Sequence, residues 1–387
     1  MKKYRPALFV GLATAFSLLG DQALYSVLPT YYTELGLLPY QVGLVLSLNR
    51  GIRLLTNHLA ERLCRRYSLS LLFGLALAGG ACVTAIYALV PIFFMLLLAR
   101  MGWGLCWSFI RQISLMTVVD SATEGNIGRL MGFYSGISRI GSIAGNFVGA
   151  LGHDLFGYTA ILVGFAVISA LAIPLGPLSR HNLRHVELTK KENGNSREAG
   201  WELLFAGFVV GCVGPGLVMS TMGLVLKEWV GESLVVGGMT IGVATLTGAL
   251  MASRWIADLA APMMGGLSDR VGRRGGATLF LMGGALVLAI GAQGSNSVSL
   301  MLAILLYFLF ATGATIALVA EAGIRGPRAV ASYVTAADFG SFAGPLIGWL
   351  MPQFALPTWF IFVLGAGLYC IAGVVAFTCF EKEKRTT

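Results

Sequence analysis

The sequence Gly265-Gly-Leu-Ser-Asp269-Arg270-Val-Gly272-Arg273-Arg274 is the most informative about the fold, because the other half of the chain contains a related sequence. That relative reads Asn57-His-Leu-Ala-Glu61-Arg62-Leu-Cys64-Arg65-Arg66, and its acid Glu61 lies 208 positions before Asp269. A second pair, Gly141-Ser-Ile-Ala-Gly145-Asn146-Phe-Val-Gly149 and Gly340-Ser-Phe-Ala-Gly344-Pro345-Leu-Ile-Gly348, repeats with an offset of 199. Two motifs repeated in the same order predict a chain built from two related halves.

The composition is that of a polytopic membrane protein. Apolar residues make up 56% of the 387 residues and charged residues 12%, with a mean hydropathy of +0.78, which is outside the range of soluble domains. Hydropathy predicts about twelve membrane spans. They cover roughly 7–29, 41–60, 69–89, 92–119, 130–151, 159–178, 202–226, 237–263, 277–293, 299–320, 330–351 and 358–380. We therefore expect an all-α membrane protein with twelve transmembrane helices in two pseudosymmetric six-helix bundles.

A charged segment at 179–201 separates the halves, and we expect it to be a cytoplasmic linker between an N-terminal bundle, 1–178, and a C-terminal bundle, 202–387. The net charge of +9 is a topology signal, since twenty of the 27 Lys and Arg fall at the termini or in alternate loops. Of the loop cations, Lys227 alone falls in the opposite set. The positive-inside rule then places both termini in the cytoplasm. We expect a bacterial inner-membrane protein that binds no nucleic acid.

Four ionisable residues are predicted to lie near the bilayer centre. Arg50 and Asp258 each precede the acid of the repeated charged stretch by 11 residues, and Arg139 and Asp338 each follow a loop arginine by 10. At ~1.5 Å per residue this spacing is roughly 15 Å, half of a ~30 Å hydrocarbon core. An unpaired charge there costs at least ~2.5–3.5 kcal/mol, so these residues indicate pairing and a transport function.

Span 4 carries a polar stripe, since Arg100, Gly104, Trp107, Arg111 and Ser114 recur with helical spacing. We expect this face to line a wet cavity; an internal ion-pair scaffold is the alternative. Asp21 and Tyr25 share a face of span 1. Asp21 lies 8 residues before Pro29 and Arg100 lies 9 residues after Pro91, at the outer ends of their spans, so their depths agree and they can pair.

The repeated stretches resemble motifs of the major facilitator superfamily. The G-x-x-x-D-R-x-G-R-R loop is complete in the second half, and Arg100-Met-Gly-Trp-Gly104 is similar to the family's R-x-x-x-G element. Span 5 is similar to the antiporter element G-x-x-x-G-P-x-x-G-G, with Asn146 at the proline position. The resemblance implies alternating access, and in the drug:proton antiporters of this family an acid in span 1 and the span 4 arginine serve proton coupling. We therefore expect Asp21 to couple protons under the control of Arg100.

The same resemblance places span 2 beside span 11 and span 5 beside span 8. It implies two interdomain ion pairs, Arg50 with Asp338 and Arg139 with Asp258. For Asp258 a local pair with Arg254, four residues earlier, competes with this prediction. The charged stretches around Glu61, Arg62, Asp269, Arg270 and Arg273 are expected to latch the halves together as a cytoplasmic gate.

If Asp21 neutralises Arg100, then Arg111 remains to bind an anion beside Tyr25 and Trp107. Spans 7 and 10 add Met219, Ser220, Thr221, Met222, Thr312 and Thr315. We expect a proton-coupled secondary transporter that exports a small amphipathic or anionic organic solute. An organic-anion:proton symporter or anion exchanger and a flippase for an anionic lipid remain open. We expect a monomer without enzymatic activity, cofactor or metal site, since no span histidine is placed to serve Ser135 as a base and neither the cysteines nor the histidines have metal-ligand spacing.

Overall fold

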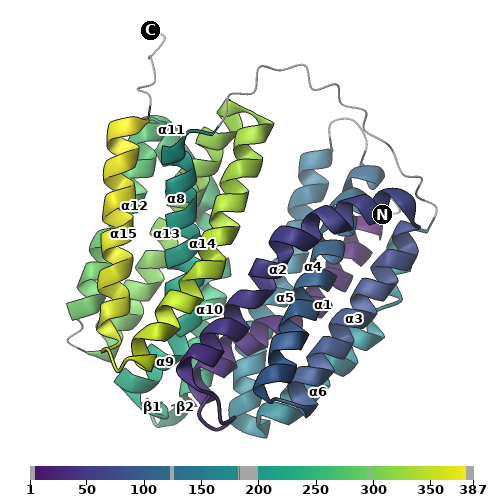
Figure 1. Ribbon diagram of the computed structural model, residues 1–387, viewed down its shortest axis with the longest axis horizontal. Coiled ribbons are helices and arrows are strands. Elements are labelled where there is room, and N and C mark those ends of the chain that lie inside the picture. The colour runs from purple at the N-terminus through teal and green to yellow at the C-terminus, as the bar shows by residue number, and fades with distance from the viewer. Residues whose placement is uncertain (1–4, 123–125, 182, 184–198, 294–295, 381–387) are drawn as a thin grey trace. The chain divides into compact units, whose positions relative to one another are not determined.

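Helices form nearly all of the computed structural model, which describes residues 5–122, 126–181, 183, 199–293 and 296–380. The first half contains α1 (Arg5–Tyr31), α2 (Pro39–Arg66), α3 (Leu69–Leu89), α4 (Phe93–Ser121), α5 (Ile127–Phe156), α6 (Tyr158–Leu171) and α7 (Leu175–Ser179) (Figure 1). The second half contains α8 (Trp201–Gly211), a π-helical segment (Cys212–Val218), α9 (Met219–Val230), α10 (Val243–Ala257), a 3₁₀ segment (Asp258–Ala260), α11 (Ala261–Val271), α12 (Arg273–Gln293), α13 (Ser297–Arg325), α14 (Pro327–Gln353) and α15 (Trp359–Cys379). Its two strands are β1 (Ser233–Val236) and β2 (Met239–Gly242).

The helices gather into two compact units. Unit 1 consists of Met1–Leu37, Leu48–Lys191 and Val235–Ala252, and unit 2 consists of Leu38–Ser47, Glu192–Leu234 and Ser253–Thr387. Each unit thus takes most of one sequence half and a short segment of the other. Of the expected linker 179–201, residues 182 and 184–198 lie outside the described part of the chain.

Seven helical stretches of the described residues are long and apolar enough to cross a membrane. They are Arg5–Tyr31, Leu69–Leu89, Phe93–Ser121, Trp201–Val230, Arg273–Gln293, Ser297–Arg325 and Trp359–Cys379. Each coincides with one of the expected spans. α2, α5 and α14 have 28, 30 and 27 residues, which at ~1.5 Å per residue exceeds a ~30 Å hydrocarbon core. They carry mid-helix charges and are therefore less apolar.

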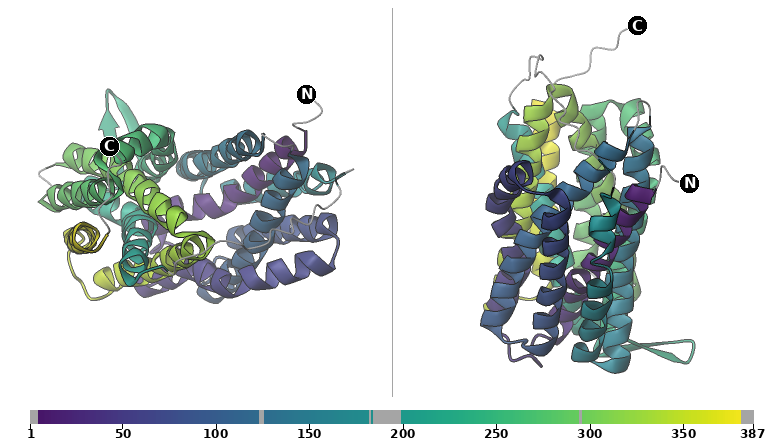
Figure 2. Two further views of the ribbon diagram at one scale, coloured as in Figure 1. Left: turned by 90° about the horizontal axis from the view of Figure 1, so that it is seen from above. Right: turned by 90° about the vertical axis from the view of Figure 1, so that its right-hand side faces the viewer.

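The predicted span 237–263 is wrong at its start, because a β-hairpin occupies residues 233–242. Gly237 and Gly238 form the turn with positive φ angles of 57° and 82°, the backbone that a two-residue hairpin turn requires. β1 and β2 pair as a two-stranded sheet, and Figure 2 shows the hairpin extending sideways from the neighbouring helices. Within each unit we name the ends by described residues: the hairpin end is the end near residues 235–242 in unit 1 and near Val230 in unit 2, and the linker end is the end near Ser179 in unit 1 and near Trp201 in unit 2.

The two charged stretches are helical, where loops were predicted. Glu61 and Arg62 lie within α2, and Asp269 and Arg270 lie within α11. The helix breaks at Gly272, whose φ of 83° suits glycine. Hydropathy marks where a span leaves the hydrocarbon, but a helix continues into water when its residues are good helix formers such as Arg and Glu.

The repeated glycines bring helix backbones into contact within each unit. A Cβ atom on Gly141 would overlap the backbone of Ala15 in α1, and one on Gly145 would lie 2.8 Å from the carbonyl oxygen of Leu19. In unit 2, a Cβ atom on Gly340 would overlap the carbonyl oxygen of Phe208 in α8. The two repeats therefore serve the same close helix packing, as small residues do in membrane proteins.

Candidate functional site

The candidate site is a buried ion pair in the middle of unit 1. Asp21 in α1 is 5% exposed, and Arg100 in α4 is fully buried. Arg100 Nη1 donates a hydrogen bond to Asp21 Oδ1, so the structure brings together the two residues whose depths agree in the sequence. Two charges removed from water are stable only when each is paired and hydrogen-bonded.

Tyr25 lies one turn beyond Asp21 and also contacts the arginine. Arg100 Nη2 donates to the Tyr25 hydroxyl at 2.9 Å, and the guanidinium carbon lies 4.9 Å from the centroid of the tyrosine ring. Tyr25 therefore contacts the cation both through its hydroxyl and through its ring face. This places the predicted substrate residue Tyr25 inside the ion-pair network.

Asn49 of α2 joins the network, a contribution that the sequence did not predict. Its Nδ2 atom lies 3.4 Å from Asp21 Oδ1, and the Tyr25 hydroxyl lies 3.5 Å from its Oδ1 atom. Asn49 is 4% exposed, and a buried amide without partners is costly. A polar residue directly before Arg50 in an expected span was the available signal.

An amide chain connects the same aspartate to α5. Gln22 Nε2 donates to Asp21 Oδ2 at 3.1 Å, and Asn146 Nδ2 donates to Gln22 Oε1 at 3.1 Å. Asn146 is the residue at the proline position of the span 5 glycine element. Proline has no side-chain donor, so a proline at this position could not make this hydrogen bond. Asn146 therefore connects α5 to the ion pair through Gln22.

The sequence model of the Major Facilitator Superfamily matches residues 10–320. The chain belongs to this superfamily. No curated protein sequence matches the chain. The helices and the motifs are consistent with this match. The family and the fold are those of transporters.

Solved structures of other transporters share the fold. A bacterial homolog of the human lysosomal transporter Spinster, in its inward-facing and unoccupied conformation, has a TM-score of 0.75 at 14% identity, covering 97% of each chain. The nucleoside transporter NupG has a TM-score of 0.74 at 14% identity, covering 98% of this chain and 100% of its own. The peptide transporter POT in complex with sulfate has a TM-score of 0.75 at 13% identity, covering 97% and 93%.

The α4 stripe of this superfamily member does not line one cavity. Gly104 packs so closely on α2 that a Cβ atom there would lie 2.6 Å from the carbonyl oxygen of Asn49. Ser114 is fully buried, and its hydroxyl lies 3.0 Å from that of Thr14. Trp107 is partly buried against a hydrophobic cluster and stacks on Trp103, with ring centroids 6.0 Å apart. The expectation of a single wet face is wrong because α1 and α2 cover most of it.

Arg111 is the exposed member of the stripe. Within the described residues, no carboxylate lies at ion-pair distance from its guanidinium. The polar and methionine residues expected to share a cavity with it are instead mostly packed inside unit 2. Met219, Ser220, Thr221, Met222 and Thr312 are at most 9% exposed. Ser220, for example, provides the carbonyl that accepts a hydrogen bond from Trp349 Nε1 at 3.1 Å.

The mid-membrane charges divide between the units. Arg50 and Arg139 belong to unit 1, and Asp258 and Asp338 belong to unit 2. The interdomain pairs Arg50 with Asp338 and Arg139 with Asp258 therefore stay predictions. Within unit 2, Asp258 forms the local alternative, an ion pair with Arg254 at 2.5 Å.

Among the expected gate residues, Glu61 pairs with Arg65 of its own helix at 2.6 Å, and both side chains are exposed. Arg62, Asp269 and Arg270 are exposed, and in the described part of the chain they form no ion pair. Arg273 Nη1 lies 3.9 Å from Glu321 Oε2. The described structure therefore shows Glu61, Arg62, Asp269 and Arg270 at the surface of their own units and Arg273 half-buried.

Two charge clusters at the linker end were missed by sequence reasoning, which treated their arginines as topology signals. Arg180 Nη2 lies 2.7 Å from Asp120 Oδ2, and both side chains are almost fully buried. In unit 2, Arg325 bridges Glu202 at 2.6 Å and Glu321 at 2.9 Å. Each cluster connects the ends of helices that are distant in sequence. Periodicity within a single helix cannot predict such contacts between helices.

Proposed function

We propose that the chain is a proton-coupled secondary transporter that exports a small amphipathic or anionic organic solute by alternating access. The observation that carries this proposal is the ion pair of Asp21 with the fully buried Arg100. A charged pair in the middle of a membrane helix bundle is costly to bury. Such a pair is therefore expected to have a function that depends on its charge, and proton transfer is a common function of acids within membranes.

The network supplies the elements of a coupling site. Burial disfavours the charged form of an acid, and a nearby cation favours it. Movement of α4 relative to α1 would change the distance from Arg100 to Asp21 and with it the proton affinity of the acid. Tyr25 and Asn49 supply further hydrogen bonds that such a movement would exchange. Asp21 is thus the proposed proton carrier and Arg100 its regulator.

The exposed guanidinium of Arg111 supports an anionic group on the substrate. Arg111 lies 11 residues after Arg100 on α4, about three helical turns. Arginine binds carboxylate or phosphate with two parallel hydrogen bonds. Trp107, one turn before Arg111, offers an aromatic surface for an apolar body.

The proposed membrane arrangement has twelve spans in two six-helix bundles, 1–178 and 202–387. α6 with α7, α8 through α9, and α10 through α11 each supply one of the twelve. Both termini and the 179–201 segment are proposed to face the cytoplasm of a bacterial cell, with the hairpin end on the opposite side. Glu61, Arg62, Asp269, Arg270 and Arg273 would then form the cytoplasmic gate.

The test uses purified protein in liposomes that contain a pH-sensitive dye. A panel of small organic anions and amphipathic compounds is added with and without an imposed gradient of one pH unit. Such a gradient is worth about 1.4 kcal/mol, so one-to-one coupling supports about tenfold accumulation. Substrate-induced proton movement identifies the substrate class, and its direction separates antiport from symport.

The variant Asp21→Asn should lose accumulation driven by the pH gradient and keep exchange of labelled for unlabelled substrate. Asp120→Asn is the matched control, because it removes the acid of another buried Asp–Arg pair in the same unit. It lowers stability by leaving Arg180 unpaired, so transport is compared per molecule of folded protein in the liposomes, and on that basis it should keep gradient-driven accumulation. Full accumulation by Asp21→Asn would mean that the Asp21–Arg100 pair only holds α1 against α4 and has no role in proton coupling. Proton-independent exchange of anions would favour the anion exchanger, and scrambling of labelled anionic lipid would favour the flippase.

A further inference from the structure

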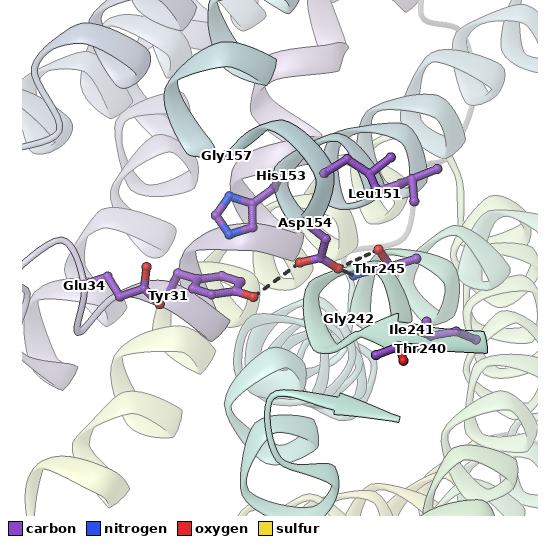
Figure 3. A pocket seen from close by; sticks show the side chains of 11 residues that line it. Tyr31, Glu34, Leu151, His153, Asp154, Gly157, Thr240, Ile241, Gly242 and Thr245 are labelled. Atoms are coloured by element: carbon purple, nitrogen blue, oxygen red, sulfur yellow. Dashed lines mark hydrogen bonds between the residues drawn. The ribbon is translucent and has the colours of Figure 1, made fainter. Parts of the chain in front are cut away.

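A cavity of about 540 Å³ lies at the hairpin end of unit 1 (Figure 3). Its walls come from the end of α1 with the turn that follows, from the end of α5, and from the hairpin with the start of α10. The polar residues in these walls are Tyr31, Glu34, His153, Asp154, Thr240 and Thr245. Asp21, Arg100 and Arg111 do not line it, so the cavity is separate from the site described above.

The volume of the cavity suits a small organic molecule rather than a single ion. Sites for small molecules usually measure ~300–1,000 Å³, whereas one water molecule occupies ~30 Å³. Within the described part of the chain, no group of three or more His, Cys, Asp or Glu is arranged to hold a metal ion. The acids and the histidine of this cavity are therefore better suited to an organic ligand.

Asp154 brings a negative charge that no cation of the described chain neutralises. Its Oδ2 atom accepts a hydrogen bond from the backbone N–H of Thr245 at 2.8 Å and another from the Thr245 hydroxyl at 2.6 Å. Its Oδ1 atom accepts a hydrogen bond from the Tyr31 hydroxyl at 3.3 Å (Figure 3). All three donors are neutral. A carboxylate has about four acceptor positions, so Oδ1 keeps one for a ligand.

Glu34 adds a second carboxylate at the rim of the cavity. Its side chain is exposed and makes neither a hydrogen bond nor an ion pair with any described residue. No lysine or arginine is among the described residues that line the cavity. The cavity therefore contains two acids and no basic group of the Lys or Arg type, and its potential attracts cations.

His153 and Tyr31 supply an aromatic wall with an unsatisfied polar atom. The two rings lie against each other, with centroids 4.1 Å apart. His153 is 9% exposed, and its Nδ1 atom has no hydrogen-bond partner among the described residues. A buried polar atom without a partner is costly, and a ligand or an ordered water is the usual remedy. The face of an aromatic ring also attracts cations.

We propose that this cavity binds a small organic cation, a molecule with a primary ammonium or guanidinium group on an apolar body. Both groups carry only donors, which match the free acceptor positions of Glu34 and Asp154. The apolar body would lie on the rings of Tyr31 and His153. An organic anion would be repelled by both carboxylates, and a neutral molecule would leave their charges unpaired. This ligand is additional to the transported solute proposed above.

The experiment measures whether a cation shields a cysteine placed in the cavity wall. Full-length protein with its six native cysteines replaced and with Leu155→Cys, a lining position, is placed in lipid nanodiscs, which leave both membrane faces open to solution. The rate of maleimide labelling is measured at constant pH and ionic strength against rising concentrations of phenethylammonium. Neutral phenethyl alcohol and anionic phenylacetate are the matched probes.

Phenethylammonium should half-protect the cysteine at a concentration about tenfold below that of the alcohol, because hydrogen bonds to charged groups are the stronger ones. Phenylacetate should not protect it. Phe156→Cys is the control position, since residue 156 is exposed and does not line the cavity. Its labelling should respond equally little to all three probes.

Two substitutions test the carboxylates. Glu34→Gln removes a charge without removing any contact of the described chain, and it should raise the half-protecting concentration of phenethylammonium several-fold. Asp154→Asn keeps an acceptor oxygen for Thr245 and should act in the same direction. Glu228→Gln is the matched control, because Glu228 is an exposed acid that does not line the cavity, and it should change nothing. In the protein without substitutions, phenethylammonium should raise the midpoint of thermal unfolding, and Glu34→Gln should reduce this rise.

Each of several results would overturn the proposal. Equal protection by phenethylammonium and phenethyl alcohol would show that charge is not recognised. An unchanged half-protecting concentration in both acid variants would exclude Glu34 and Asp154 as the partners of the cation. Equal protection at positions 155 and 156 would assign the effect to the lipid. Absence of both protection and thermal stabilisation at millimolar phenethylammonium would show that the cavity does not bind it. The assay needs neither transport nor a pH gradient, so its outcome is separate from that of the transport assay.

Discussion

Arg254 and Asp258 form an ion pair one helical turn apart, with Nη1 and Oδ1 at 2.5 Å, and the hydroxyl of Thr312 lies 3.2 Å from both atoms. The pair lies where α10 gives way to a 3₁₀ segment. α13 thus contributes a hydroxyl to a charged pair on the interrupted span. This local pair neutralises Asp258 within unit 2. A second ion pair of Asp258 with Arg139, as predicted, can therefore be tested against the local pair.

Reversing one charge of a predicted interdomain pair should abolish transport, and reversing both should restore part of it. Arg50→Asp and Asp338→Arg alone each place like charges in a low-dielectric site, which costs several kcal/mol. The double variant restores an ion pair with the opposite polarity. Uptake in proteoliposomes measures both. No recovery in a double variant that is folded and inserted would contradict the Arg50–Asp338 pair.

The local pair provides the matched comparison. The double variant Arg254→Asp with Asp258→Arg keeps an ion pair four residues apart on the same helix. If Asp258 also pairs with Arg139, this exchange places two cations together and transport should be lost. Unchanged transport would mean that Arg254 alone is the functional partner of Asp258.

Removing one member of the Asp120–Arg180 pair should destabilise the protein by about 3–5 kcal/mol, because the partner charge would remain buried and unpaired. Both side chains are at most 4% exposed, and Arg180 also donates to the Thr117 hydroxyl at 2.9 Å. Asp120→Leu with Arg180→Leu should be less destabilising than the sum of the single changes. Chemical unfolding in detergent measures this cycle, and additive effects would show that the pair is not coupled.

Gly141→Ala should destabilise the protein by about 1–3 kcal/mol, because the new methyl group overlaps the backbone of Ala15 in α1. Gly136→Ala on the same helix is the control, since a Cβ atom there meets no atom within 4 Å. It should be neutral or slightly stabilising, because alanine favours helix by up to about 1 kcal/mol. Thermal unfolding in detergent compares the two variants, and equal midpoints would argue against close contact of α1 with α5.

Arg111→Ala should weaken substrate binding while leaving proton release through Asp21 intact. Loss of a bidentate contact to an anion costs about 1.5–3 kcal/mol, roughly 10- to 150-fold in affinity. The measurement is the substrate concentration that half-saturates proton movement in proteoliposomes. Arg111→Lys is the control, since it keeps the charge without the planar fork and should fall in between. An unchanged half-saturation value for Arg111→Ala would remove it from the binding site.

Tyr67→Cys and Thr240→Cys should label from opposite sides of the membrane. Tyr67 is exposed between α2 and α3 at the linker end, and Thr240 is exposed in the hairpin. In intact cells, a membrane-impermeant maleimide should reach the cysteine at 240 and not that at 67. The reverse pattern would invert the orientation inferred from the distribution of lysine and arginine.

The class of the protein can be read from hydropathy and motifs. Hydropathy and the two repeated motifs predicted a helical membrane protein of the major facilitator superfamily, and the family match confirms this. Depth counting from Pro29 and Pro91 paired Asp21 with Arg100, because a helix advances by a constant rise per residue. A regular rise converts sequence distance into depth, so residues that must meet at one level of a membrane can be matched before the fold is known.

What covers each helix face, in contrast, follows from the packing of the helices and cannot be read from periodicity. Periodicity placed Arg100, Gly104 and Ser114 on one side of α4, but α1 and α2 occupy that side, so the expected cavity stripe is mostly buried. The same limit hid Asn49 beside the ion pair and Asp154 beneath the first turn of α10. A polar helix face is satisfied equally well by water or by a neighbouring helix. Which of the two it meets depends on contacts between residues far apart in the sequence, such as Thr14 and Ser114, and these contacts exist only once the helices have packed.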